Sequence, residues 1–157
     1  MFRLIVLFAG SLLTAVCAAQ VEVKDAWARP AVQGQSGTGA FMTLTAPKGA
    51  RLLGAASSVA GVTEIHEMAM EGNMMKMRAV PHLDLPAGTS VELKPGGYHV
   101  MLMDLKRPLA LGEKITIDFR IETADGKRAT LPVQIEVRTR PPQGAAPSAA
   151  PAGAHKH

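Results

Sequence analysis

The sequence predicts an all-β protein, built as an antiparallel β-sandwich or a Greek-key barrel. Apolar and polar residues alternate in many short segments, as they do in strands that bury one face. Turn signals rich in Gly, Pro and Asn separate nearly all of these segments, at a spacing of roughly 8 to 12 residues. After residue 19, no segment shows a convincing helical period of about 3.6 residues. These observations favour many short strands over helices.

The alternation is clearest in the last third of the chain. Residues 115–121 and 131–137 each alternate apolar with mostly polar side chains, and Asp125-Gly126 between them is typical of a hairpin turn. Pro132 cannot donate a hydrogen bond to a neighbouring strand, so we expect its strand to begin at a sheet edge or after this residue. The other expected strands cover residues 21–27, 38–45, 63–70, 74–80, 90–94 and 98–103.

The chain has 157 residues, of which 47% are hydrophobic, and this length predicts one folded domain. A positive charge precedes apolar residues 4–16, a segment too short to span a membrane but typical of a signal peptide. We therefore expect a signal peptide over residues 1–19, cleavage after Ala19, and an exported remainder without a membrane span. Lipidation of Cys17 is the less favoured alternative, because Val16 is a poor residue before a lipidated cysteine.

Two further segments follow the expected signal peptide. Residues 20–140 contain all the expected strands and form the predicted β-sandwich domain, which also holds the metal-binding residues described below. Residues 141–157 are rich in Pro and Ala and contain no large apolar side chain. We expect this segment to be a flexible tail, which ends in His-Lys-His.

The composition excludes several classes of function. Cleavage would remove Cys17, the single cysteine, and with it disulfides, a cysteine nucleophile and a thiolate-bound copper centre. The formal net charge of +4 is spread without a run of Lys or Arg, and few aromatic residues remain after export, so nucleic-acid binding is not expected. Glu64, Glu67 and Glu71 are explained by a charged hairpin rim, so we do not expect an enzyme.

Methionines concentrate in a predicted hairpin. Five of the nine methionines lie between residues 68 and 77. Gly72-Asn73 predicts the turn, and with these two residues as the loop, His66 faces Ala79 and Met68 faces Met77. His66 and Met77 are then diagonal neighbours on one face, close enough to reach a common ion.

A second group of soft donors lies on the strand expected over residues 98–103. Strand alternation places His99, Met101 and Met103 on one face, and the opposite face is the natural core face. Thioether sulfur is neutral and polarisable, so it binds Cu(I) well and offers little to Mg²⁺ or Ca²⁺. Zinc sites favour Cys, His and carboxylate. Two imidazoles and two thioethers, from His66, Met77, His99 and Met101, therefore indicate a cysteine-free Cu(I) site.

These four positions resemble the signature of the periplasmic copper chaperone PCu(A)C family, which is His, ten residues, Met, twenty-one residues, then His-x-Met. Ten residues separate His66 from Met77, twenty-one separate Met77 from His99, and one separates His99 from Met101. The resemblance covers about residues 21–137. It includes the segments 25–30, 64–66 and 95–102.

The resemblance implies a cupredoxin-like antiparallel β-sandwich that binds Cu(I) near its surface through His66, Met77, His99 and Met101. It also implies a periplasmic location and delivery of copper toward the CuA centre of cytochrome c oxidase. The implied partners are the copper subunit of that oxidase and a Sco-type thiol protein. We expect the protein itself to be a monomer.

Two features lie outside the four-residue signature. Glu67 stands where family members often carry Met, although that position is not a core ligand. C-terminal extensions of some family members bind Cu(II), and imidazole suits Cu(II) better than thioether does. His155 and His157 are therefore candidate ligands of a secondary Cu(II) site.

The residue pattern leaves alternative functions open. A copper-sequestering or resistance protein would use the same donors but keep its metal. A β-sandwich interaction module would use its methionines as an adhesive apolar surface. Packing or surface placement explains Met68 and Met103 more readily than metal binding does. Met70, Met74 and Met75 either form a soft rim that attracts copper or have no role.

Overall fold

The structure, a computed structural model, describes residues 21–142. These residues form ten strands and no helix, so the prediction of an all-β protein is confirmed. The strands are β1 (Glu22–Ala28), β2 (Gly37–Thr45), β3 (Ala50–Ala56), β4 (Ala60–Glu71), β5 (Met74–Ala79), β6 (Leu83–Leu85), β7 (Ser90–Leu93), β8 (His99–Leu105), β9 (Lys114–Thr123) and β10 (Arg128–Val137).

Hydrogen bonds join the strands in the order β5-β4-β8-β2-β1-β10-β9-β3-β6, and β7 pairs with the end of β2 that β8 leaves free. Among the described strands, β1 and β10 pair in parallel, with Trp27 beside Glu136, and the other pairs are antiparallel. Parallel neighbours need a long connection, and here the whole chain between the first and last strands supplies it. The sheet is therefore mixed, not wholly antiparallel.

The predicted hairpin near the C-terminal end is present as β9 and β10. Gly126 in its turn has a φ of 82°, a conformation that glycine adopts readily. β10 begins at Arg128, ahead of Pro132, which pairs with Asp118 on β9. On its other side β10 pairs with β1 only at Glu136 and Val137, so Pro132 lies at an edge where a missing donor is tolerated. The edge alternative for Pro132 therefore fits the structure.

Two strands, β3 and β6, were not among those expected from the sequence. β3 contains small residues and has an irregular register between Leu52 and Gly54, so its apolar residues do not alternate cleanly. β6 has three residues, which is too short for a visible period. Both strands nevertheless contribute to the core, since Leu52 and Leu85 are almost fully buried.

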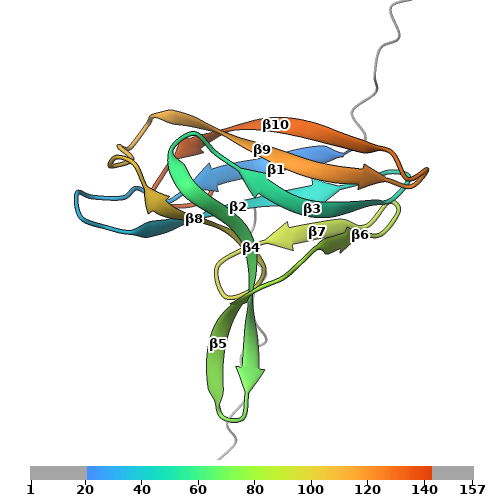
Figure 1. Ribbon diagram of the computed structural model, residues 1–157, viewed down its shortest axis with the longest axis horizontal. Helices are drawn as coiled ribbons and strands as arrows, with labels where there is room; N and C mark the ends of the chain where they lie inside the picture. Colours follow the sequence, from blue (N-terminus) through green and yellow to red (C-terminus); the bar gives the residue numbers. More distant parts are fainter. Residues whose placement is uncertain (1–20, 143–157) are drawn as a thin grey trace, which may run out of the picture.

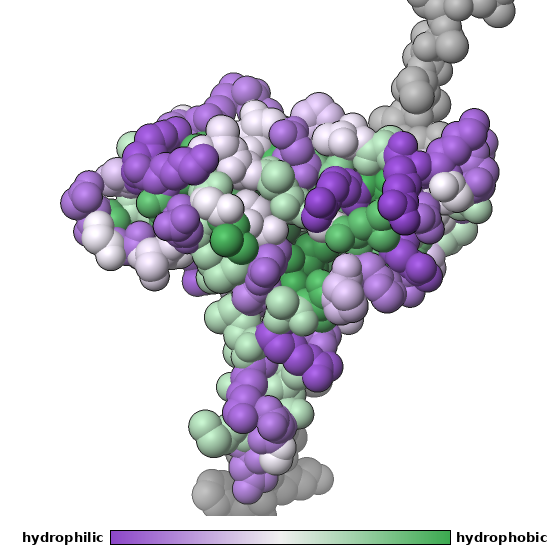
Figure 2. Space-filling model, viewed as in Figure 1, coloured by the Kyte–Doolittle hydropathy of each residue, from purple (hydrophilic) through white to green (hydrophobic). Residues whose placement is uncertain are grey.

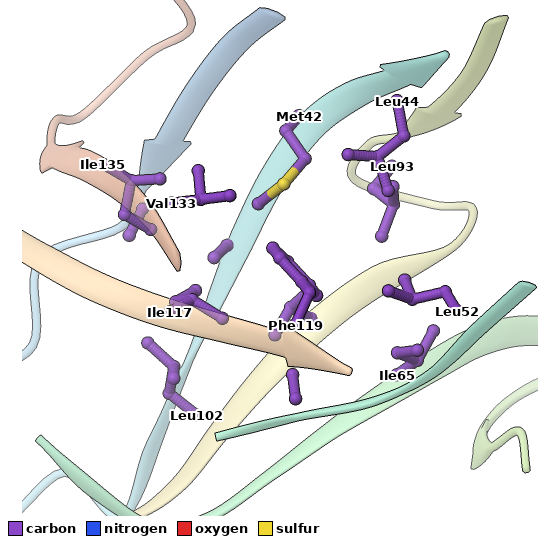
Figure 3. Packing of buried hydrophobic residues seen from close by; sticks show 14 of the residues in the cluster. Met42, Leu44, Leu52, Ile65, Leu93, Leu102, Ile117, Phe119, Val133 and Ile135 are labelled. Atoms are coloured by element: carbon purple, nitrogen blue, oxygen red, sulfur yellow. The ribbon is translucent and has the colours of Figure 1, made fainter. Parts of the chain in front are cut away.

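One hydrophobic core holds the strands together. Figure 3 shows Phe119 and Ile117 of β9 packed among buried side chains of other strands, including Leu102 of β8 and Ile65 of β4. Each of these side chains is 3% exposed or less. Complete burial of one such side chain contributes about 1.5 to 3 kcal/mol to stability.

This core fixes which side chains of β4 and β8 face outward. Ile65, Val100 and Leu102 are 0 to 2% exposed and lie on the core side. Because strand side chains alternate, His66 and His99 must lie on the opposite face. A slip of one residue in either strand would expose the core residues, so the hydrophobic core holds the register.

The end of β4 and all of β5 project from the body of the molecule as a two-stranded arm, here defined as residues 67–79 (Figure 1). The turn lies at Gly72, whose φ is 64°. His66 pairs with Ala79 and Met68 pairs with Met77. The hairpin and its register are therefore those predicted from the sequence.

The two ends of the chain lie mostly outside the described residues. This applies to the predicted signal peptide, residues 1–19, and to the predicted tail from residue 143 onward, with His155 and His157. Within residues 21–142, no helix is long and apolar enough to cross a membrane.

Candidate metal centre

Two histidines lie directly opposite each other where the arm joins the body. His66 on β4 pairs with His99 on β8, and their ring centroids are 5.9 Å apart. His99 is 6% exposed, and the side chain of His66 is 12% exposed. The two rings are thus largely shielded from water, although they lie on the face of the sheet opposite the hydrophobic core.

The hydrogen bonds of His99 leave one ring nitrogen available. Its Nδ1 lies 3.0 Å from the carbonyl oxygen of Gly97. A carbonyl only accepts hydrogen bonds, so Nδ1 carries the proton and Nε2 of the neutral ring is unprotonated. That Nε2 lies 3.2 Å from Sδ of Met77. Two atoms that both offer lone pairs therefore converge at this point, as they do when they share a cation.

His66 is arranged in a complementary way. Its Nε2 lies 2.9 Å from Oε2 of Glu64, and an ionised carboxylate only accepts, so Nε2 donates. Its Nδ1 is buried and has no hydrogen-bond partner among the described residues. Burial of a polar atom without a partner costs about 1 to 3 kcal/mol of stability. The unprotonated Nδ1 is therefore well suited to give its lone pair to a metal ion. A carboxylate that orients a histidine in this manner is common at metal sites.

Met77 reaches the histidines from the arm. It is 50% exposed, whereas His99, its contact, is buried. This contact therefore brings together a buried imidazole of the body, His99, and a solvent-accessible thioether of the arm, Met77.

Met101 shares the outer face with the histidines, and the methyl end of its side chain lies near β2. It lies on β8, opposite Glu64 on β4 and Gly39 on β2. Its methyl carbon Cε lies 3.7 Å from the place that a Cβ would take at Gly37. The side chain thus extends over β2. Its three rotatable side-chain bonds give the thioether freedom to move on this face.

Phe41 of β2 lies beside His99, and Trp27 of β1 packs against Phe41. The ring centroid of Phe41 lies 6.4 Å from that of His99 and 4.8 Å from that of Trp27. Both aromatic rings are buried, yet neither belongs to the main core cluster. A Cβ at Gly39 would lie 2.9 Å from the Phe41 ring, so glycine at this position leaves room for the ring as it lies here. Trp27 is buried, but beside the site and not in the main core.

The contacts of Glu64 with His66 and of Phe41 with His99 were not predicted from the sequence. Glu64 was interpreted as part of a charged rim, and the contact of Phe41 with His99 was not foreseen. Strand alternation within β4 places Glu64 on the same face as His66, and this pattern could have identified Glu64 as the hydrogen-bond partner of His66. The contact of Phe41 depends on the pairing of β2 with β8, which is remote in sequence.

The remaining donors near the site are soft. Within residues 21–142, no three residues of the types His, Cys, Asp and Glu come together as a group that could hold a metal ion. Met103 on β8 and Met68 on β4 are both half-buried, and Met68 lies opposite Met77. The site can therefore offer two imidazole nitrogens and a thioether, with a second thioether in reach from Met101.

The geometry predicts opposite tautomers for the two histidines. Long-range proton–nitrogen NMR at about pH 8, where ordinary imidazoles are neutral, should find the proton on Nε2 of His66 and on Nδ1 of His99. Replacement Glu64→Ala removes the acceptor of His66, so His66 should become a mixture of tautomers. His99, held by a backbone carbonyl, should stay unchanged as an internal control. A single unaltered tautomer of His66 in the variant would show that Glu64 does not orient it.

Comparisons with known proteins identify relatives. The family model of LpqE-like lipoproteins matches residues 21–135. Lxx21020 of Leifsonia xyli subsp. xyli, which is named as a lipoprotein, is 35% identical over 119 residues, or 75% of this chain and 69% of that protein. RP573 of Rickettsia prowazekii is 36% identical over 107 residues, which cover 64% of this chain and 59% of RP573.

Solved structures share the fold. The solution structure of DR1885 from Deinococcus radiodurans with Cu(I) is 36% identical, covers 76% of this chain and 81% of that chain, and has a TM-score of 0.56. The copper-bound PCuAC domain from PmoF2 is 19% identical, covers 76% of this chain and 94% of that chain, and has a TM-score of 0.57, a likeness that shows the fold alone. The predicted cupredoxin-like β fold is confirmed. The chain belongs to the LpqE-like lipoprotein family, and its domain has the fold of PCuAC domains.

Proposed function

We propose that this protein is an exported copper chaperone that holds one Cu(I) between His66, Met77, His99 and Met101. The observation that carries the proposal is the 3.2 Å approach of the unprotonated Nε2 of His99 to Sδ of Met77. Metal–nitrogen bonds of about 2.0 Å and metal–sulfur bonds of about 2.3 Å place such donors roughly 3.5 Å apart around a tetrahedral ion. The contact is close to the spacing that a shared ion would impose.

The donor chemistry selects the ion. Thioether sulfur and neutral imidazole suit Cu(I), and the site offers no cluster of hard oxygen ligands among the described residues. Relatives support the same ion, because DR1885 has been solved with Cu(I) and the PmoF2 domain with copper. Nδ1 of His66, which is buried and has no hydrogen-bond partner within residues 21–142, would gain one on binding. Met101, on the same face of β8 as His99, would complete the set with its flexible thioether.

The exposure of the donors supports delivery over storage. A storage site is expected to enclose its ion, whereas here Met77 is 50% exposed and lies on a projecting arm. An acceptor protein could displace this thioether first, while buried His99 still holds the ion. Stepwise replacement of ligands lets a metal pass between proteins without being released into water.

The acceptor and the location are part of the proposal. The family resemblance supports delivery toward the CuA centre of cytochrome c oxidase, beside a Sco-type thiol protein, on the periplasmic side of the membrane. The lipoprotein relatives support export. The alternative function is that of a periplasmic protein that sequesters copper.

Substitution of one thioether tests the site. Met77→Ile removes a sulfur ligand and keeps an apolar, strand-compatible side chain, so we expect Cu(I) affinity to fall by at least about tenfold. Competition with a Cu(I) chelator measures the change. Met74→Ile is the matched control, because Met74 lies on the same strand and pairs on the opposite face of the arm. Unchanged affinity in both Met77→Ile and Met101→Ile would contradict the four-ligand site.

Transfer of copper separates delivery from storage. Anaerobic mixing of the Cu(I)-loaded protein with the apo form of a soluble CuA domain, followed by chromatographic separation, should move most of the copper to the acceptor. The thiolates of that acceptor bind Cu(I) more strongly than thioethers do. A Cu(I)-loaded protein that keeps its metal in the presence of this acceptor would instead support sequestration.

A further inference from the structure

The arm has two chemically different faces. The paired positions show that one face carries Met68 opposite Met77 and Met70 opposite Met75. The other face carries ion pairs between Glu67 and Arg78 and between Glu71 and Lys76, together with Met74. Figure 2 shows apolar side chains interspersed with hydrophilic ones along the arm. We call the first face the thioether ladder, composed of Met68, Met70, Met75 and Met77.

The ladder does not serve the hydrophobic core. Met70, Met75 and Met77 are 64%, 51% and 50% exposed, far above the exposure of any residue in the core cluster. The opposite face carries ion pairs and the turn carries a glycine, and neither feature requires methionine on the ladder face. Four methionines at two consecutive paired positions of one face, three of them exposed, therefore call for another explanation.

The ladder is continuous with the candidate metal centre. Directly opposed residues of an antiparallel pair have Cβ atoms about 4.5 to 5.5 Å apart, so the two sulfurs of Met70 and Met75 can reach one ion. Two residues along a strand span about 7 Å, so the rung of Met68 and Met77 follows within the reach of flexible side chains. Met77 belongs to that rung and also contacts His99.

We propose that Met70 and Met75 form an outer Cu(I) site at the tip of the arm, from which the ion passes through the rung of Met68 and Met77 to the histidines. This inference depends on the proposed function, because the inner site is the destination. The ion stays Cu(I) throughout. At each step a new copper–sulfur or copper–nitrogen bond replaces an old copper–sulfur bond, and no proton or electron is transferred.

The chemistry of the two sites sets the direction of transfer. The outer site offers two exposed thioethers and no imidazole, so it should bind Cu(I) weakly and exchange it rapidly. The inner site adds two imidazole nitrogens, and that of His66 is buried with no hydrogen-bond partner in the described part of the chain, so the inner site should bind more tightly. A weak site at the exposed end and a tight site at the base would load the protein from its tip.

Methionine methyl NMR tests this proposal residue by residue. The full exported chain is labelled with ¹³C at the methionine methyl groups and titrated anaerobically with Cu(I). The first equivalent should shift the signals of Met77 and Met101, and a second equivalent should shift those of Met70 and Met75. Met74, on the charged face, should not respond. Immobile signals of Met70 and Met75, or an equal response of Met74, would overturn the outer site.

Variants link the outer site to transfer. The double substitution Met70→Leu and Met75→Leu should abolish the second equivalent and slow Cu(I) uptake from a chelator complex several-fold. The double variant should bind the first equivalent with unchanged affinity. The control Met74→Leu should show both unchanged affinity and the wild-type rate of uptake. Wild-type uptake by the double variant would overturn the route. Failure of the inner site would give a different result, because the methyl signal of Met77 would then not shift during addition of the first equivalent.

Discussion

The alternation of β4 and β8 is the constraint on which the site depends. Ile65, Val100 and Leu102 are held in the core, and this burial obliges His66 and His99 to meet on the other face. No residue needs to pull the imidazoles together, because apolar burial elsewhere on the same strands sets their positions. Hydrophobic packing thus holds the two histidines in place.

A second level of order acts on the ring nitrogens. Glu64 and the carbonyl of Gly97 each fix one nitrogen of a histidine, so that the other nitrogen is presented without a proton. Without a metal, His66 then has a buried acceptor nitrogen that no described residue pairs with, and lone pairs of His99 and Met77 are in contact. These arrangements are unfavourable without a cation, and binding of Cu(I) would relieve both. The free energy of binding at this site would therefore include the relief of unfavourable contacts as well as new bonds.

The features predicted correctly from the sequence are local ones. Gly72-Asn73 and the alternation around it were sufficient for the register that pairs Met68 with Met77, because a tight turn determines the pairing of its own strands. The orientation of Met101 and the support of His99 by Phe41 depend on β2, whose partner β8 is some sixty residues away in the chain. The short strand β6 carries too few residues for a detectable pattern.

X-ray absorption at the copper edge tests the central claim most directly. The protein loaded with one equivalent of Cu(I) should show a mixed coordination shell, with nitrogen at about 2.0 Å and sulfur at about 2.3 Å. Such a shell would mean that imidazoles of the body and thioethers share one ion. A shell of nitrogen and oxygen without sulfur, or of sulfur alone, would contradict the account, because His99 and Met77 would then not bind the same metal.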